Sequence, residues 1–252
     1  MDLSGKVCLV TGASRGIGAA IAERFAEAGA TIVIHYGSDR KAAEAVFGRL
    51  PGDHHVVLGT DLSEPDTVAD YVDSVMSKVD RLDVLVNNAG IYTDHPLLKS
   101  ERDEWLESWN KILAVNLLSP AVLCHAAGQI MAEQGGGRII NIGSRGAFRG
   151  EPVCPAYGAS KAGLHAMSQS LAVALGPANI QVFAIAPGFT ETDMVTDLLA
   201  SEEGAMIKAQ SPMNRVARPA EIAETACFLA ATDAEFLTGG IFDVNGASYL
   251  RS

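Results

Sequence analysis

The sequence predicts a single doubly wound α/β domain, in which helices cover both faces of a mainly parallel seven-stranded sheet. Short apolar runs rich in β-branched residues alternate with longer alanine-rich segments along the whole chain of 252 residues. Most of the short runs are continuously apolar, as in Ile139-Ile140-Asn141-Ile142, and a strand covered by helices on both faces needs that composition. No linker, low-complexity tract or internal repeat divides residues 1–252, so one domain is expected.

The expected elements alternate in type along the chain. The strand candidates are 6–11, 31–36, 55–60, 83–87, 138–143, 180–186 and 240–244. The helical candidates are 17–28, 41–50, 64–79, 102–134, 157–175 and 220–231. The fourth is too long for one ordinary helix, and Pro120 is expected to interrupt it. Residues 189–215 have poor periodicity and would overhang the carboxyl edge of the sheet, which predicts a substrate lid; an ordinary surface loop is the alternative.

Composition excludes several classes of protein. With 48% hydrophobic and 19% charged residues the chain can build a large core, which excludes a disordered chain. A net charge of -11 argues against a nucleic-acid partner and against docking on anionic lipid. The four cysteines form no CxxC pair, so free thiols are expected and no metal site. The chain shows no secretory signal and no long apolar run, so a cytoplasmic protein without a membrane partner is expected.

A glycine-rich loop joins the first expected strand to the first helix. Its residues are Thr11-Gly12-Ala13-Ser14-Arg15-Gly16-Ile17-Gly18. Glycines at this spacing allow a tight turn and a close approach of the backbone to a pyrophosphate, and the N–H groups of the helix N-terminus favour an anion. The loop therefore predicts a dinucleotide-binding domain, with Gly12, Ser14, Arg15, Gly16, Ile17 and Gly18 at the phosphates.

The end of the second strand predicts which dinucleotide binds. NAD-binding versions of this fold place an acidic residue there for the ribose hydroxyls, but this strand ends in His35-Tyr36-Gly37-Ser38 with no acid before Asp39. A 2′-phosphate needs a cation and hydroxyl donors, which Arg15, Ser38 and Ser14 could supply. NADP(H) is therefore the expected cofactor, and NAD(H) is the lesser alternative.

A tyrosine and a lysine lie one turn apart on the fifth helical segment. Tyr157 and Lys161 have i, i+4 spacing and therefore share a helix face. A phenol is a poor base at neutral pH, and a nearby ammonium group is expected to lower its pKa. Ser144 follows the fifth strand, at the carboxyl edge, where its hydroxyl could donate to a substrate carbonyl. Taken alone, a Tyr and a Lys at this spacing are an ordinary packing pair.

In combination these motifs resemble the short-chain dehydrogenase/reductase family, nearest to its 3-oxoacyl-carrier-protein-reductase-like members. The resemblance covers essentially the whole chain. Its elements, in family order, are Thr11-Gly12-x3-Gly16-x-Gly18, Asn87-Asn88-Ala89-Gly90, Asn116, Ser144, Tyr157-x3-Lys161, Pro187-Gly188 and residues 238–246. The resemblance implies a Rossmann-type fold, a nicotinamide-dependent oxidoreductase acting on a small carbonyl or alcohol substrate, and a homotetramer.

The resemblance also implies roles for individual residues. Tyr157 would be the general acid/base, Lys161 would lower its pKa and hold the nicotinamide ribose, Ser144 would orient the carbonyl, and Asn116 would anchor a water leading to Lys161. The remaining implied cofactor contacts are Tyr36, Asp61, Leu62, Asn88, Ala89, Gly90, Pro187, Gly188, Thr190 and Thr192.

The substrate is left open. Residues 125–137 carry no Lys or Arg, and a net charge of -11 repels an acidic carrier protein, which weighs against a carrier-bound substrate. Arg145 and Arg149 could grip an anionic substrate or could be surface charges. Pocket candidates are Tyr92, His95, Phe148, Val153, Cys154 and Phe189. A 3-oxoacyl-carrier-protein reductase, an NAD-linked alcohol dehydrogenase and a non-catalytic NADP-binding regulator remain alternatives.

Overall fold

The computed structural model, which describes residues 1–192 and 199–251, contains one seven-stranded sheet in which every pairing is parallel. The strand order is β3-β2-β1-β4-β5-β6-β7. The bounds are β1 (Val7–Val10), β2 (Thr31–Tyr36), β3 (Val56–Gly59), β4 (Val84–Asn87), β5 (Gly137–Ile142), β6 (Ile180–Pro187) and β7 (Ile241–Val244). The order reverses between β1 and β4, and in such sheets the ligand cleft opens at this point, outside the carboxyl ends of the strands.

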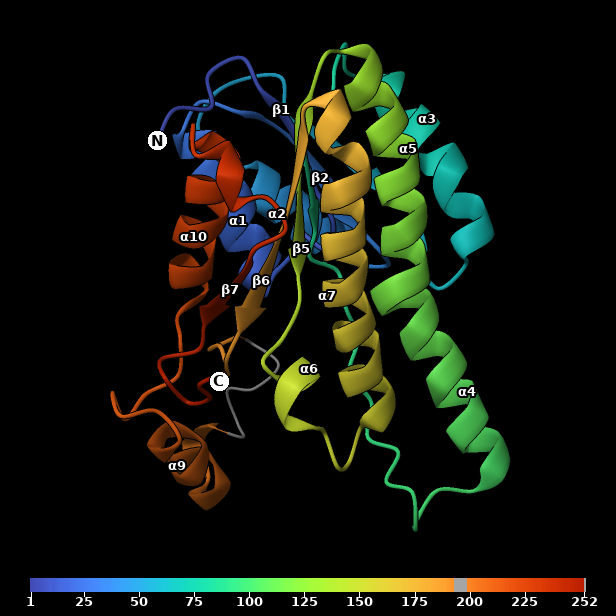
Figure 1. The fold of residues 1–252 in the computed structure, drawn as a ribbon, viewed down its shortest axis with the longest axis vertical. Helices are drawn as coiled ribbons and strands as arrows, with labels where there is room; N and C mark the ends of the chain where they lie inside the picture. Colours follow the sequence, from blue (N-terminus) through green and yellow to red (C-terminus); the bar gives the residue numbers. More distant parts are fainter. Residues whose placement is uncertain (193–198, 252) are drawn as a thin grey trace.

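Helices cover both faces of the sheet, as the continuously apolar strands require (Figure 1). One layer holds α1 (Gly16–Glu27), α2 (Arg40–Phe47) and α10 (Pro219–Ala231). The other holds α3 (Val68–Met76), α5 (Ser119–Glu133) and α7 (Pro155–Leu175), with α4 (Arg102–Leu113) packed beside α7. Within residues 1–192 and 199–251, the connections contain the short 3-10 helices η1 (Pro65–Thr67), η3 (Gly176–Ala178) and η5 (Glu235–Leu237). The predicted doubly wound fold is confirmed.

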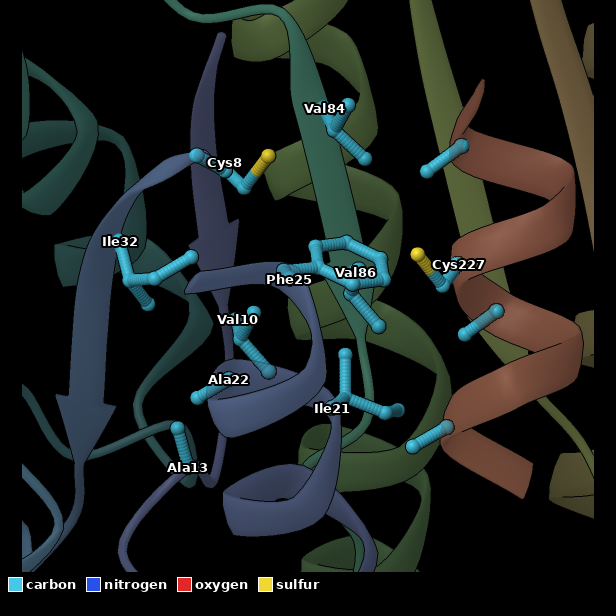
Figure 2. Packing of buried hydrophobic residues seen from close by; sticks show 14 of the residues in the cluster. Cys8, Val10, Ala13, Ile21, Ala22, Phe25, Ile32, Val84, Val86 and Cys227 are labelled. Atoms are coloured by element: carbon cyan, nitrogen blue, oxygen red, sulfur yellow. The ribbon is translucent and has the colours of Figure 1, made fainter. Parts of the chain in front are cut away.

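The core is divided between these two layers. Figure 2 shows Phe25 of α1 among strand residues and facing Cys227 of α10, in the cluster that fills the α1/α10 side. Phe25 is fully buried, and burying a side chain of this size contributes about 1.5–3 kcal/mol to folding. All four cysteines are buried and free, as expected from their spacing.

The long helical segment is interrupted, though not at the proline. A π turn, η2 (Ala114–Leu118), lies between α4 and α5, and Pro120 follows it within the first turn of α5. A π turn leaves the regular i→i−4 hydrogen-bond ladder, and such turns often occur at functional sites. By length and composition the run Arg102–Glu133 could cross a membrane, and 56% of its apolar window is buried inside the molecule, as in a core helix.

Two short helices lie over the carboxyl edge of the sheet. They are α6 (Gly146–Arg149) and α9 (Glu202–Ala209), and both lie at the bottom of Figure 1, near the ends of β6 and β7. Met206 and Ile207 fall in α9, within the segment 189–215 that we expected to form a lid. The apolar residues of this segment that we expected to make short helices also include Leu199, which is buried, and Met194 and Leu198, which lie outside the described residues.

Candidate functional site

The glycine loop has the backbone conformation that its sequence predicts. Gly12 and Gly16 have φ values of +62° and +57°, in the left-handed region that glycine adopts without strain. A Cβ on Gly18 would collide with the Gly12 carbonyl oxygen and with Nδ2 of Asn88. Only glycine therefore fits at position 18, and its absent side chain lets α1 begin against the end of β1.

The ends of β1 and β4 are tied together by side chains of the predicted cofactor site. The Thr11 hydroxyl accepts the N–H groups of Asn88 at 2.9 Å and Ala89 at 3.0 Å. Asn88 returns two bonds, from Nδ2 to the carbonyl oxygens of Thr11 at 2.8 Å and Gly12 at 3.2 Å. These bonds form the floor of the cleft at the point where the strand order reverses. They assign Asn88 a structural role on the loop side.

A third strand joins this network through a buried histidine. His35 Nδ1 accepts the N–H of Gly12 at 3.0 Å, and His35 Nε2 lies 3.0 Å from the Thr60 carbonyl, to which it donates. Burial lowers the pKa of His35 to about 4, so the ring is neutral at neutral pH and Nδ1 is free to accept. We did not predict a role for His35 from the sequence. A polar residue within an otherwise apolar strand was the available signal.

The residues predicted to contact a 2′-phosphate lie in the loops that follow β1 and β2. Arg15 is exposed, and among the described residues its guanidinium has no hydrogen-bond or ionic partner. Ser38 is also exposed. Asp39, the first acid after β2, caps α2 by accepting the N–H of Ala42 at 3.0 Å. Arg40 pairs with Glu44 at 2.8 Å. Asp39 and Arg40 thus have partners within α2, whereas the described part of the chain supplies none for the Arg15 side chain.

The other residues predicted on this side have varied surroundings. Tyr36 packs its ring across Gly59 of β3. The Asp61 carboxylate accepts the N–H and hydroxyl of Ser63, both at 2.8 Å, and these bonds lower its pKa. Leu62 is buried, and its carbonyl accepts the Ser119 hydroxyl at 2.7 Å. Leu62 is therefore mainly a packing residue, whereas Asp61 and Tyr36 stay close to the opening of the cleft.

The helix α7 carries the tyrosine and the lysine toward the end of β5. Lys161 is 4% exposed, and its Nζ donates to the Ile142 carbonyl at 2.8 Å and lies 5.8 Å from the centroid of the Tyr157 ring. Burial lowers the pKa of Lys161 to about 8. Ser144 is the second residue after Ile142 and accepts the Gly146 N–H at 2.9 Å. The Ser144 side chain is also hydrogen-bonded to Tyr157, so the two hydroxyl groups lie next to each other in the site.

One expectation about the tyrosine is wrong in this structure. Burial raises the pKa of Tyr157, and Glu151 and Cys154 add to the effect, while its hydrogen bond with Ser144 opposes it. Lys161 does not lower this pKa, because its ammonium group is turned to the Ile142 carbonyl and not to the phenol oxygen. Tyr157 is thus held as a phenol, which suits a group that donates a proton.

The π turn positions Asn116 inside the cleft wall. Asn116 is fully buried, its Oδ1 accepts the Ile91 N–H at 2.8 Å, and its Nδ2 donates to the Ile91 carbonyl at 3.0 Å and to Ser160 Oγ at 3.2 Å. A Cβ on Gly90 would lie 3.4 Å from both Asn116 Oδ1 and Lys161 Nζ. The structure therefore brings Asn116, Gly90 and Lys161 together in the cleft wall.

The loop after β6 closes the opposite side of the cleft. Pro187 is buried, and its carbonyl accepts the Arg145 N–H at 3.0 Å, while Gly188 donates to Val244 at 3.0 Å. The Thr190 hydroxyl donates to the Gly188 carbonyl at 3.2 Å. A Cβ on Gly16 would meet Thr192 Cγ2 at 3.2 Å, so this loop reaches the glycine loop. The four predicted residues of this segment therefore border the same cleft.

The chain is similar in sequence to a protein family and to individual named proteins. A family model described as "Enoyl-(Acyl carrier protein) reductase" matches residues 12–247. The 3-oxoacyl-[acyl-carrier-protein] reductase FabG of Aquifex aeolicus (strain VF5) is 39% identical over 252 residues, covering 99% of each chain. The corresponding protein of Escherichia coli (strain K12) is 39% identical over 250 residues, with 99% of this chain and 100% of that one covered. The chain belongs to the short-chain dehydrogenase/reductase family.

Solved structures extend the likeness to other short-chain dehydrogenases/reductases. A proposed gluconate dehydrogenase from Agrobacterium tumefaciens is 31% identical, with a TM-score of 0.90 over 98% of this chain and 97% of that one. A proposed short-chain alcohol dehydrogenase from Sinorhizobium meliloti 1021 is 33% identical, with the same TM-score and coverage. The protein is accordingly an oxidoreductase that acts on a CH–OH or C=O group and takes a nicotinamide cofactor.

The pocket candidates of this short-chain dehydrogenase/reductase separate into two groups, apart from Phe148, whose ring stacks on that of His165 with centroids 5.0 Å apart. His95 and Cys154 are buried, and His95 packs against Trp105 with ring centroids 5.2 Å apart, so both belong to the wall behind the site. Tyr92 is 47% exposed with its ring 5.1 Å from that of Tyr157. The Arg145 guanidinium lies 5.2 Å from the centroid of the Phe189 ring. Candidates that border the opening are therefore Tyr92, Val153 and Phe189.

Proposed function

We propose that this short-chain dehydrogenase/reductase is NADP(H)-dependent and transfers hydride between the nicotinamide and a small carbonyl or secondary alcohol substrate. The observation that carries the proposal is the placing of Ser144, Tyr157, Lys161 and Asn116 at the carboxyl ends of β4 and β5. A bound nicotinamide supplies the hydride, and the protein supplies position and protons. A non-catalytic regulator would have no need of this set.

The protein residues have distinct tasks in carbonyl reduction. The Ser144 hydroxyl donates to the substrate oxygen and orients it beside the Tyr157 phenol. Tyr157, whose pKa is raised by burial, remains protonated at neutral pH and donates its proton to the oxygen as negative charge develops there. Lys161 is held by the Ile142 carbonyl within reach of the cleft floor, where its ammonium group would bind the nicotinamide ribose. Proton donation of this type contributes about 10²–10⁴-fold to the rate.

The proposal that NADP(H) is the cofactor rests on the open glycine loop and on polar groups that have no partner in the described residues. The conformation of Gly12 and Gly16 and the missing side chain of Gly18 leave the start of α1 open to a pyrophosphate. No acidic residue lies in the first turn of α1 and no side chain caps it, so its N–H groups are available to an anion. The free Arg15 guanidinium, with Ser38 and Ser14, favours the 2′-phosphate of NADP(H) over the free hydroxyl of NAD(H).

A 3-oxoacyl-carrier-protein substrate is the second candidate, favoured by the identity of 39% with reductases of that name. The net charge of -11 disfavours an acidic carrier through long-range repulsion. These effects can be separated by supplying the same 3-oxoacyl group on a carrier protein and on pantetheine. If repulsion dominates, the KM for the carrier form falls as salt is added, while the KM for the pantetheine form does not change.

The decisive experiment is a screen of the purified protein with NADPH and NADH against ketones, aldehydes, acyl thioesters and gluconate in both reaction directions. We expect reduction of at least one carbonyl substrate with a clear preference for NADPH. Preference for NADH would point to an NAD-linked dehydrogenase, and binding of NADPH without turnover of any substrate would contradict the enzymatic proposal. We also propose a cytoplasmic homotetramer with a substrate lid formed by residues 189–215, to be checked by sedimentation and by proteolysis with and without substrate.

A further inference from the structure

The residue after Ser144 is a buried arginine. Arg145 is 3% exposed, and burial lowers the pKa of its guanidinium to about 10. Within residues 1–192 and 199–251 it makes no ion pair with a carboxylate. Its side-chain contacts are a hydrogen bond from Nη2 to Gln210 Oε1 at 2.6 Å and the Phe189 ring at 5.2 Å. Buried charges in proteins are normally paired. Among the described residues Arg145 has no carboxylate within ion-pair distance: Glu151 acts on it from farther away and is itself paired with Arg149.

A second arginine is directed at the same atom. Arg149, at the end of α6, donates from Nη1 to Gln210 Oε1 at 3.4 Å. Arg149 also pairs with Glu151 at 3.5 Å, which neutralises it. The two guanidinium groups therefore converge on one uncharged amide oxygen, carried by the residue that ends α9. An amide oxygen is a weaker acceptor than a carboxylate oxygen, and this position would be better filled by an anion.

The structure has a pocket at this place. It has a volume of about 110 Å³ and is lined by Arg145, Phe189, Ile207, Arg215, Glu221 and Asn245, among others. Arg215 is neutralised there by a two-pronged bond to Glu221, with both distances 2.7 Å. Of the charged residues that line the pocket, Arg145 is thus the one that forms no ion pair with a carboxylate of the described residues. A ligand with one negative charge would balance it. That balance fits a carboxylate and disfavours a phosphate dianion.

We propose that Arg145 binds the carboxylate of a small oxo acid or hydroxy acid and thereby holds its carbonyl or alcohol carbon at Ser144 and Tyr157. In the structure the side-chain amide of Gln210 occupies the place proposed for this carboxylate. When the acid binds, this amide moves aside or shares the guanidinium with the carboxylate. Ser144 and Tyr157 do not line the pocket itself, so the proposal requires an acid long enough to reach from the Arg145 guanidinium to them. The adjacency of Arg145 and Ser144 in the chain limits that span. The inference rests on the proposed function for the reaction, but the anion site itself does not.

The kinetic test compares oxo acids of four to six carbons with their methyl esters, in the wild type and in Arg145→Met. Met fills a similar volume without charge. For the wild type we expect kcat/KM to favour the acid over its ester by about 100-fold, as a charge-assisted bond of this kind provides. In Arg145→Met the KM for the acid should rise roughly 30-fold, while the ester is unaffected and NADPH affinity is kept. Arg145→Lys should recover part of the loss.

A matched control and a binding measurement keep the test independent of turnover. Arg49→Met should leave the KM for the acid unchanged, because Arg49 pairs with Glu23 on an exposed face and does not line the pocket. Calorimetric titration of the NADP⁺-loaded protein with pentanoate should show binding to the wild type and none to Arg145→Met. Equal kcat/KM for acid and ester, or an equal loss of both in Arg145→Met, would overturn the proposal. Tighter binding of a butyl phosphonate than of pentanoate would overturn the carboxylate assignment.

The outcomes also separate this inference from the proposed function. If the wild type reduces oxo acids and esters equally well, the anion site is refuted and the reductase stands. If nothing is reduced but pentanoate binds to the wild type and not to Arg145→Met, the anion site stands and the reductase is refuted.

Discussion

The Nδ1 atom of His35 accepts the backbone N–H of Gly12 at 3.0 Å, so the second strand sets the conformation of the first glycine of the cofactor loop. The same ring donates through Nε2 to Thr60 after β3. One neutral imidazole therefore connects the loops that follow β1 and β3, on the two sides of the adenosine end of the cleft. This is a positioning role, because His35 is 2% exposed and does not line the opening.

His35→Leu should weaken NADPH binding about tenfold, since leaving the Gly12 N–H unpaired costs about 1–3 kcal/mol and loosens the loop. Fluorescence titration with NADPH measures the effect. His55→Leu is the matched control: His55 Nδ1 accepts the Ile32 N–H at 3.0 Å in the same strand, away from the loop. The control should lose stability and retain NADPH affinity. If both variants lost NADPH affinity equally, the link between His35 and the glycine loop would be refuted.

Gly18→Ala should abolish NADPH binding, because the new methyl group collides with the Gly12 carbonyl and with the Asn88 amide that fixes it. Forcing a methyl group into a packed site costs about 1–3 kcal/mol, and here the backbone that must move is the phosphate loop. Equilibrium dialysis and urea unfolding measure both effects. Gly176→Ala is the control, since its φ of -52° is helical and nothing lies within 4 Å of the added methyl group. Normal NADPH affinity in Gly18→Ala would contradict the assigned role of the loop.

Arg15→Ala should raise the dissociation constant of NADPH roughly 30-fold and leave that of NADH unchanged. The reason is the loss of a charge-assisted contact to the 2′-phosphate, which contributes about 1.5–3 kcal/mol. Arg40→Ala should alter neither constant appreciably, because Arg40 pairs with Glu44 on the exposed face of α2. A parallel loss for NADH and NADPH would indicate that Arg15 serves the shared pyrophosphate and not the 2′-phosphate.

Tyr157→Phe should lower kcat by about 10²–10⁴-fold, because the phenol is the proton donor to the carbonyl oxygen. NADPH affinity should be unchanged, since removing one oxygen leaves the packing of α7 intact. The control is Tyr92→Phe, which loses the same atom from a ring 5.1 Å away and should keep most of its activity. Steady-state kinetics with the substrate found by screening gives kcat for both variants. A fully active Tyr157→Phe would exclude Tyr157 as the acid.

Local patterns in the sequence were sufficient to predict the strands and the conformation of the glycine loop, and they supplied the candidates for the catalytic side chains. Continuously apolar runs and glycine spacing depend on neighbours along the chain, and these are visible in sequence. The interruption of the long helix was predicted at Pro120, but the structure places it in the π turn that buries Asn116. Proline is tolerated in the first turn of a helix, so it follows the irregular turn and does not cause it.

Features that depend on contacts between distant segments were not predictable in this way. The raised pKa of Tyr157 comes from burial, and the direction of the Lys161 ammonium comes from the Ile142 carbonyl on another element. The burial of Arg145 against Gln210 joins residues 65 positions apart. Sequence reasoning named Arg145 as a candidate anion contact, but whether it lay at the surface or in a pocket required the fold.

His165, one turn after Lys161 on α7, should make the protein sensitive to mild acid. It is 3% exposed, and neither ring nitrogen has a hydrogen-bond partner within the described part of the chain. Its ring stacks on Phe148 with centroids 5.0 Å apart. Burial, with the charges of Lys161 and Arg251, lowers the pKa of His165 from 6.5 to about 4. The folded protein therefore keeps this ring neutral in a pH range where the unfolded chain protonates it.

The sign follows from proton binding. Between pH 6.5 and 4 the unfolded state binds more protons than the folded state at this position, so the free energy of unfolding falls as the pH falls through that window. On going from pH 7 to pH 5 the loss in the free energy of unfolding from His165 is about 2 kcal/mol.

His165→Leu removes this loss and also removes two unpaired buried polar atoms, so the variant should be more stable than the wild type at pH 7 and its advantage should grow at pH 5. Urea unfolding at both pH values measures the difference. His125→Leu, on the exposed side of α5, should leave it unchanged, and an equal pH dependence in wild type and His165→Leu would show that His165 does not carry the effect.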